Sequence, residues 1–173
     1  MTNSANKSMR LLLALALLTC CVGCDQATKH IATESLRGQP PRSYFLNTFR
    51  LEYARNPGGF LSFGGDLAPQ FRFGLFAVLN VVFLAGTVYV LATRWEMHLA
   101  RFVAAVLLLA GGSGNLIDRA LQDGFVTDFL NVGIGPVRTG IFNIADVALT
   151  AGVLALLATC RSTEDAKHEH TGK

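Results

Sequence analysis

The stretch FGLFAVLNVVFLAGTVYVLA, residues 73–92, contains no charged side chain. As a helix, these 20 residues would be about 30 Å long, which is the thickness of the hydrocarbon core of a bilayer. A second run of the same length, residues 141–160, has Asp146 as its only charge. Both runs are typical of transmembrane helices, so we expect the chain to cross a membrane more than once.

Two further apolar segments complete the pattern. Residues 99–117 contain Arg101 near one end, where a long basic side chain can reach the membrane surface. Residues 11–24 are short for a span, but a helix that continues to about Glu34 would supply the missing length. We therefore predict a membrane all-α protein with one domain over residues 1–160 and a polar tail over residues 161–173. Its four spans are expected at residues 9–30, 73–92, 99–117 and 141–160.

The first span has an alternative interpretation. Lys7 and Arg10, followed by the apolar block and Cys24, resemble a lipoprotein signal that is cleaved before the cysteine. Cys21 occupies the position where such signals usually carry an aliphatic residue, and three more spans follow. Both observations favour a retained first helix.

The composition agrees with a membrane protein: 51% of the residues are hydrophobic and 16% are charged, against about a quarter in soluble domains. The net charge of +3 is not clustered into a basic stripe, so we expect no nucleic-acid partner. The four cysteines show no metal-binding spacing with histidine, and we interpret them as buried apolar filler. We see no internal repeat.

Four spans would place both termini on the same side of the membrane. Raw counts do not decide the orientation, because the side of the termini has seven basic residues and the other side has eight. The density of basic residues close to the spans favours the cytoplasm for the side of the termini. On the opposite, outer side of the membrane, residues 49–53 alternate with period two and predict a strand, which a turn at residues 56–59 ends. A second turn is expected at residues 64–66. The second outer segment, residues 119–140, is rich in glycine and is predicted to be loop or short strand.

Ionisable groups at membrane depth are costly and mark candidate functional sites. Asp146 lies within the last span, with Asn143 three residues earlier and so on the same predicted helical face. Asp128 lies between apolar residues, as expected for a carboxyl that dips into the bilayer. Asn115, Asp118 and Arg119 share one face at the end of the third span, where Asp118 and Arg119 look like an ion pair.

Asp128 and Asp146 are the natural couple for catalysis. Two neighbouring carboxyls cannot both ionise easily, so one keeps a proton while the other is charged. The charged carboxylate can take a proton from water, and the neutral carboxyl can hydrogen-bond the substrate carbonyl. This chemistry needs no metal and no cofactor. As a structural alternative, Asn143 and Asp146 could simply join helices through hydrogen bonds.

Five motifs occur in order: Asp25-Gln26-Ala27-Thr28-Lys29, Asn56-x-Gly58, Gly114-Asn115-Leu116-Ile117-Asp118-Arg119, Val126-Thr127-Asp128-Phe129 and Phe142-Asn143-Ile144-Ala145-Asp146. Together they resemble lipoprotein signal peptidase, signal peptidase II, from about Met9 to Cys160. The resemblance implies four transmembrane helices, a small periplasmic β-cradle and a second periplasmic loop or helix. It also implies an aspartic endopeptidase of the bacterial inner membrane that needs no metal.

The resemblance further implies a substrate and the roles of residues. The substrate is a prolipoprotein that carries diacylglycerol on its lipobox cysteine and is cleaved just before that cysteine. Asp128 and Asp146 form the catalytic dyad. Residues that orient the dyad or the substrate are Asp25, Asn56, Gly58, Asn115, Asp118, Arg119 and Asn143. Expected partners are membrane lipid and cyclic peptide inhibitors such as globomycin, and the chain is expected to act as a monomer.

One departure from the family pattern falls at Gly59-Phe60-Leu61, where many relatives have Ala-Ala-Phe after the glycine. Its expected effect is on lipid or inhibitor preference rather than on catalysis.

Three rival functions are weaker. Gly111-Gly112-Ser113-Gly114 matches the nucleophile motif of rhomboid-type serine proteases, but no histidine is well placed to activate Ser113. A transporter or proton channel would have carboxylates near mid-membrane and often repeated halves. A catalytically inactive relative that acts as a binding protein is not indicated, because both dyad acids are present.

Overall fold

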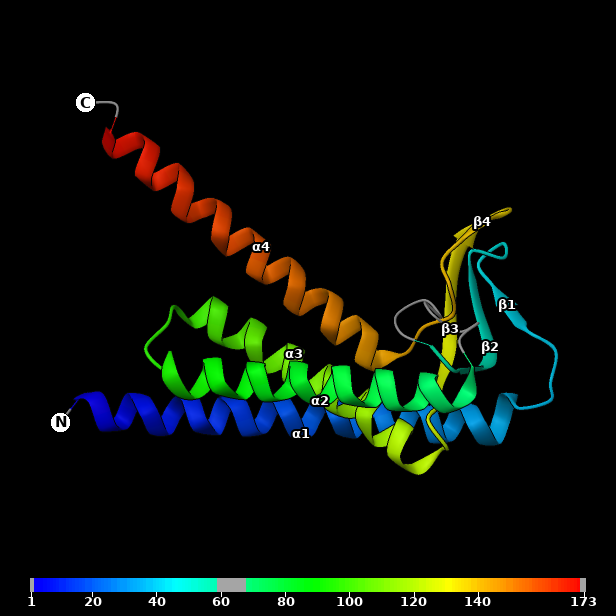
Figure 1. Ribbon diagram of the computed structural model, residues 1–173. Coiled ribbons are helices and arrows are strands. Elements are labelled where there is room, and N and C mark those ends of the chain that lie inside the picture. Colours follow the sequence, from blue (N-terminus) through cyan, green and yellow to red (C-terminus); the bar gives the residue numbers. More distant parts are fainter. Residues whose placement is uncertain (1, 59–67, 172–173) are drawn as a thin grey trace.

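The computed structural model describes residues 2–58 and 68–171, which form four helices and a small sheet (Figure 1). The helices are α1 (Thr2–Leu36), α2 (Pro69–Thr93), α3 (Leu99–Leu121) and α4 (Ile144–Thr171). Asn6–Leu36, Gly74–Thr93 and Leu99–Leu121 are long and apolar enough to span a membrane, and the apolar part of α4, Ile144–Thr159, is shorter. The predicted spans are therefore confirmed as three long apolar helices and one shorter one. The first helix continues past the predicted end to Leu36, and α4 continues past Cys160 to Thr171.

Helix α3 lies between the other helices and packs against α1, α2 and α4. Its contact with α4 depends on glycine. A Cβ atom on Gly111 would collide with the carbonyl oxygen of Ala145, and one on Gly152 would lie 2.9 Å from the carbonyl oxygen of Ala104. Small residues let two backbones approach closely, as is common between transmembrane helices. Towards its C-terminal end α4 diverges from the other helices (Figure 1).

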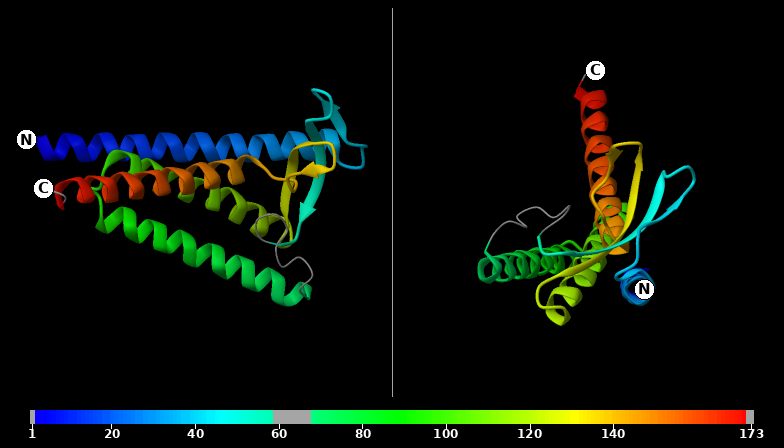
Figure 2. Two further views of the ribbon diagram at one scale, coloured as in Figure 1. Left: turned by 90° about the horizontal axis from the view of Figure 1, so that it is seen from above. Right: turned by 90° about the vertical axis from the view of Figure 1, so that its right-hand side faces the viewer.

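The sheet lies at the end of the helices that is remote from both termini (Figures 1 and 2). Its strands are β1 (Arg42–Tyr44), β2 (Phe49–Asn56), β3 (Val126–Ile134) and β4 (Val137–Arg138), in the order β1-β2-β3-β4 with antiparallel pairing throughout. The strand predicted at residues 49–53 is confirmed. The second outer segment was expected as loop, helix or short strand. It forms the nine-residue strand β3, because its backbone pairs with β2 from the first outer segment.

Apolar contacts fix the sheet on the helices. Ala32 and Leu36 at the end of α1 pack with Phe129 of β3, and Tyr53 and Ile144 contact the same cluster. The chain between β3 and α4 also pairs with β3: the Leu130 and Phe142 backbones exchange hydrogen bonds of 2.8 Å in both directions. This pairing brings the residue after Phe142 beside β3.

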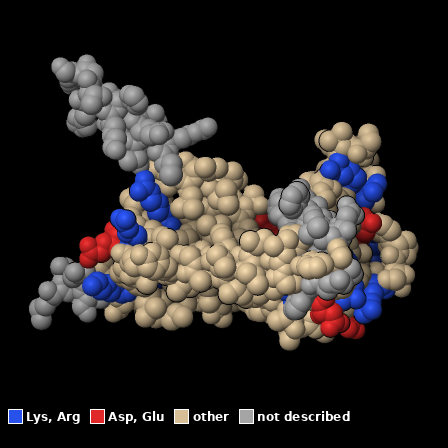
Figure 3. Space-filling view, viewed as in Figure 1, with Lys and Arg blue, Asp and Glu red and all other residues tan. Residues whose placement is uncertain are grey.

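The surface between the two charged ends of the molecule is largely uncharged (Figure 3). Apolar side chains on α2 such as Val78, Val82 and Tyr89 are 50 to 70% exposed, as expected for residues that face lipid. Cys20 and Cys24 are exposed on α1, so the prediction that the cysteines are buried filler is wrong for these two. The predicted turn at residues 64–66 and the Gly59-Phe60-Leu61 departure lie outside the described residues.

Candidate active site

All nine residues singled out in the sequence are buried and gather where the sheet meets the helix ends. They come from five elements: α1, the end of β2, α3, β3 and the start of α4. The described residues contain no cluster of three or more side chains suited to hold a metal ion. The buried polar groups of the site are carboxyls, amides, one lysine and one arginine.

Asn143 holds the two candidate catalytic carboxyls together. Its Nδ2 donates a 2.6 Å hydrogen bond to Oδ1 of Asp128, and its backbone N–H donates to Oδ2 of Asp146 at 3.2 Å. In return, the backbone N–H of Asp146 donates to Oδ1 of Asn143 at 3.0 Å. This reciprocal pair is a capping box at the N-terminus of α4, which begins at Ile144. Asn143 is thus the cap of the helix, whereas the sequence had placed it on a helical face.

Neutral amides satisfy all four carboxyl oxygens of the pair. Oδ2 of Asp128 accepts from Nδ2 of Asn56 at 2.8 Å, and Oδ1 of Asp146 accepts from Nδ2 of Asn115 at 3.0 Å. Burial of Asp128, reinforced by the nearby Asp146 charge, raises the pKa of Asp128 to about 7, against the opposing effect of the bonds from Asn56 and Asn143. A carboxyl with such a pKa exists in both protonation states near neutral pH, as acid–base catalysis requires.

A buried charge cluster lies beside the pair. Nζ of Lys29 is 2.8 Å from Oδ2 of Asp25 and 3.2 Å from Oδ2 of Asp118, and it donates to Oδ1 of Asn115 at 3.1 Å. The expected ion pair of Asp118 with Arg119 is therefore wrong: Asp118 pairs with Lys29. Sequence reasoning also missed Lys29 as a site residue, although a lysine four residues after Asp25 shares its helical face.

The two acids of this cluster tie α1 and α3 to the rest of the site. Oδ1 of Asp25 accepts a 2.8 Å bond from the backbone N–H of Ala145, in the first turn of α4, where a negative charge is favoured. Oδ2 of Asp118 accepts from the backbone N–H of Thr127 at 2.9 Å. The acids thus fix the position of the residues next to Asp146 and Asp128.

Arg119 connects α3 to the ends of both outer segments. Its Nη2 donates to the carbonyl oxygen of Gly58 at 2.7 Å, and its Nη1 donates to that of Gly124 at 3.1 Å. The backbone N–H of Gly58 donates in turn to Oδ1 of Asn56 at 2.9 Å. Arg119 and Gly58 therefore hold the Asn56 side chain that contacts Asp128.

A cavity of about 290 Å³ reaches Asp146 from between α2 and α4. Apolar side chains of α2, including Phe76, Leu79 and Phe83, form one wall, and Leu149 lies on the α4 side. Asn115, Arg119 and Asp146 lie at its polar end.

The fold and site define a multi-pass membrane protein with two buried aspartates, Asp128 and Asp146, bridged by Asn143 at one end of its helices. The family model described as signal peptidase (SPase) II matches residues 17–161. A lipoprotein signal peptidase of Sphingopyxis alaskensis is 38% identical over 136 residues, 78% of this chain and 76% of the relative. Those of Streptococcus pneumoniae and Borrelia duttonii are 34% and 30% identical and cover 79% and 90% of this chain, and 84% and 94% of their own lengths.

A solved structure described as a bacterial membrane enzyme superposes with a TM-score of 0.74 at 28% identity. The match covers 88% of this chain and 90% of that one. The chain belongs to the lipoprotein signal peptidase family, signal peptidase II, and is an aspartic peptidase. The resemblance derived from the five sequence motifs is thereby confirmed.

Proposed function

We propose that this peptidase cleaves prolipoproteins whose lipobox cysteine carries diacylglycerol, just before that cysteine, with Asp128 and Asp146 as the catalytic dyad. The observation that supports the proposal most strongly is the double role of Asn143. One residue donates hydrogen bonds to both carboxyls, by its side chain to Asp128 and by its backbone to Asp146. Asp146 lines the end of the cavity that opens between α2 and α4, and Asn143 links Asp128 to it.

In the proposed reaction the dyad holds one proton. The charged carboxylate takes a proton from a water molecule as that water attacks the scissile carbonyl carbon, while the protonated carboxyl donates a hydrogen bond to the carbonyl oxygen. The resulting tetrahedral intermediate collapses when the C–N bond breaks and the leaving amine accepts a proton from a carboxyl. The dyad returns to its singly protonated form. The pKa of about 7 for Asp128 supports a shared proton at neutral pH.

The remaining polar residues are proposed to position the dyad. Asn56, Asn115 and Asn143 donate to the carboxyls, so they fix where the carboxyl planes point. Asp25 and Asp118 hold the backbone beside each catalytic residue, and Arg119 with Gly58 holds Asn56. A 1 Å displacement of a reacting group can cost about 100-fold in rate, so these residues are expected to matter as much as a direct contact.

We also propose how the chain is placed in the inner membrane. Both termini lie at the end of the bundle opposite the dyad (Figure 1). The basic residues of this end follow from the helix bounds: Lys7 and Arg10 near the start of α1, Arg94 just after α2 and Arg101 at the start of α3. The positive-inside rule assigns this end to the cytoplasm and the sheet to the periplasmic face. A lipid-anchored substrate would then reach the dyad from within the outer leaflet. Globomycin-like cyclic peptides are proposed to occupy the same cavity, and the enzyme is proposed to work as a monomer.

The test is a gel-shift cleavage assay on purified diacylglyceryl prolipoprotein. Asp128→Asn and Asp146→Asn, made separately, are each expected to abolish cleavage while membrane insertion is retained. Asp123→Asn is the matched control, because Asp123 is exposed and has a backbone φ of 55°, which asparagine tolerates. The control should cleave at the wild-type rate. Full activity in either dyad variant would contradict the proposed mechanism.

A further inference from the structure

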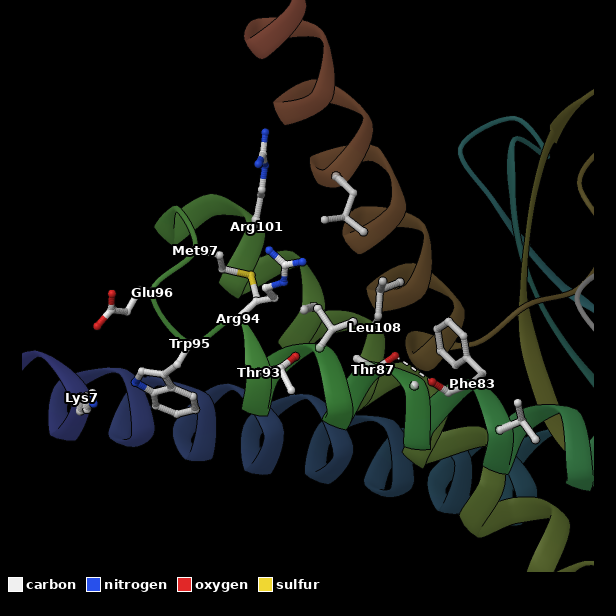
Figure 4. Close-up of a pocket in the computed structure, with 15 residues that line it drawn as sticks. Lys7, Phe83, Thr87, Thr93, Arg94, Trp95, Glu96, Met97, Arg101 and Leu108 are labelled. Carbon is white, nitrogen blue, oxygen red and sulfur yellow. Dashed lines mark hydrogen bonds between the residues drawn. The ribbon is translucent and has the colours of Figure 1, made fainter.

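A second, larger cavity lies at the end of the bundle opposite the dyad (Figure 4). It has a volume of about 1110 Å³ and lies among α2, α3, α4 and the loop between α2 and α3. Apolar side chains from three helices, such as Val82, Val90, Leu108 and Leu156, form its walls. Phe83 lines both this cavity and the one beside Asp146, so the two adjoin on α2.

The rim of this cavity is basic. Lys7 on α1, Arg94 at the end of α2 and Arg101 on α3 line it, against the single carboxylate of Glu96. In Figure 4 the Arg94 and Arg101 side chains extend towards α4, whereas Glu96 lies on the far side of the loop. Nη2 of Arg101 donates to the carbonyl oxygen of Thr159 at 3.1 Å, which holds this cation between α3 and α4.

The loop that carries Arg94 and Glu96 is fixed in place. Arg10 of α1 donates through Nη1 to the carbonyl oxygens of Trp95 and Met97. The Trp95 ring packs edge-on against Phe102, with ring centroids 5.3 Å apart. Tryptophan and basic residues together are typical of the headgroup level of a membrane. The basic rim is therefore held at that level, above an apolar groove that faces the acyl chains.

We propose that this groove binds an anionic phospholipid, with its phosphate at Arg94 and Arg101 and an acyl chain along the α2 and α4 walls. Basic pockets between transmembrane helices are suited to anionic headgroups, and each nearby cation strengthens the attraction about fivefold, which corresponds to about 1 kcal/mol. A zwitterionic lipid brings its own ammonium group next to the phosphate, so the two arginines favour it less. The site is separate from the dyad and does not depend on the proposed reaction.

Trp95 makes the proposal testable, because it is the only tryptophan in the chain and lines the groove. The purified full chain is reconstituted into phosphatidylcholine vesicles that contain a fixed fraction of a brominated lipid, which quenches nearby indole fluorescence. Brominated phosphatidylglycerol is expected to quench Trp95 more strongly than brominated phosphatidylcholine. The preference for the anionic lipid is obtained from the quenching at increasing lipid fractions, and it should fall about fivefold in Arg94→Gln.

Three further variants serve as controls. Glu96→Gln removes the acidic group of the rim and should raise the preference, and Arg94→Lys should retain it. Arg42→Gln removes one exposed cation at the opposite end and should leave the preference unchanged. Prolipoprotein cleavage shows that each variant is folded. Equal quenching by the two lipids, or the same loss in Arg42→Gln as in Arg94→Gln, would overturn the proposal and leave these residues as ordinary cations at the membrane surface.

Discussion

Lys29 is the residue whose removal should damage the site most without touching the dyad. Its side chain is 3% exposed, and its ammonium group neutralises one of two buried carboxylates, Asp25 and Asp118, which lie 2.8 and 3.2 Å away. Lys29→Met keeps most of the volume and removes the charge. The buried cluster then changes from a net charge of −1 to −2, with no cation left in it.

The expected loss in free energy of unfolding depends on the hydrogen bonds that Asp25 and Asp118 retain without Lys29. Breaking a buried ion pair by removing one member costs about 3–5 kcal/mol. Asp25 keeps its bond from the Ala145 N–H, and Asp118 keeps its bond from the Thr127 N–H, so neither carboxylate loses every donor. We therefore expect the lower part of this range, about 3 kcal/mol, for the loss in free energy of unfolding.

A double-mutant cycle separates this effect from lost packing. Asp25→Asn added to Lys29→Met removes one of the two uncompensated charges and keeps an oxygen for the Ala145 N–H. It should restore about 1–3 kcal/mol, whereas Asp25→Asn in the wild-type chain should be destabilising, because it weakens the contact with Lys29. The measurement is the unfolding free energy in mixed micelles, followed by Trp95 fluorescence. A Lys29→Met variant within 1 kcal/mol of the wild type, with no recovery in the double variant, would refute the argument from buried charge.

Three other predictions test separate parts of the structure. The pKa of Asp128 is about 4 in the unfolded chain and about 7 in the folded protein, so the unfolded state binds fewer protons between these values. The free energy of unfolding should therefore fall as the pH rises from 4 to 7. Asp128→Asn should lose this pH dependence when unfolding is measured from pH 4 to 8. Gly114→Ala places a Cβ atom 2.6 Å from Oδ2 of Asp25 and should destabilise the protein by about 1–3 kcal/mol. The control Gly86→Ala has open space at its Cβ and should not destabilise the protein. Equal melting temperatures for the two variants would contradict this prediction. Ser113→Ala should keep substantial prolipoprotein cleavage, because the proposed reaction uses no serine, and complete loss in the gel-shift assay would revive a serine nucleophile.

The helices could be predicted from the sequence because each one carries its own signal. Runs such as residues 73–92 are long and uncharged, and a membrane span needs little else to be recognised. Strand β3 carries no comparable signal. Its stability depends on pairing with β2 far away in the chain, as in the match of Asn56 with Val126 and of Ala54 with Asp128. The apolar neighbours of Asp128 therefore suggested a carboxyl in the bilayer, although they belong to a strand that packs on α1.

The candidate site was likewise predicted only in part: its residues were identified, but their contacts across the fold were not. Its acids and amides were found because polar groups in or beside spans are unusual and because their motifs resemble a known family. Their interaction partners were not predicted. A contact such as that of Lys29 with Asp118 joins α1 and α3, and the sequence does not show which faces of these two helices pack together. Arg119 was assigned to its neighbour in sequence, whereas its partners are the carbonyl oxygens of Gly58 and Gly124. Adjacency along the chain is a poor guide to an ion pair when a buried cation from another helix is available.

The side chain of Asn115 joins the dyad to the buried charge cluster of Lys29, Asp25 and Asp118, and Lys29 determines how this amide is oriented. The Lys29 ammonium can only donate, so the side chain of Asn115 must turn its oxygen towards Lys29 and its Nδ2 towards Oδ1 of Asp146. Nδ2 of Asn143 lies 3.2 Å from the same Asn115 oxygen, which fixes the second amide as well and directs it to Asp128. The positive charge thereby orients the donors of the dyad while it remains paired with Asp25 and Asp118. The hydrogen bonds to the dyad come only from neutral donors, and burial raises the pKa of Asp128 although the nearby charge of Lys29 lowers it.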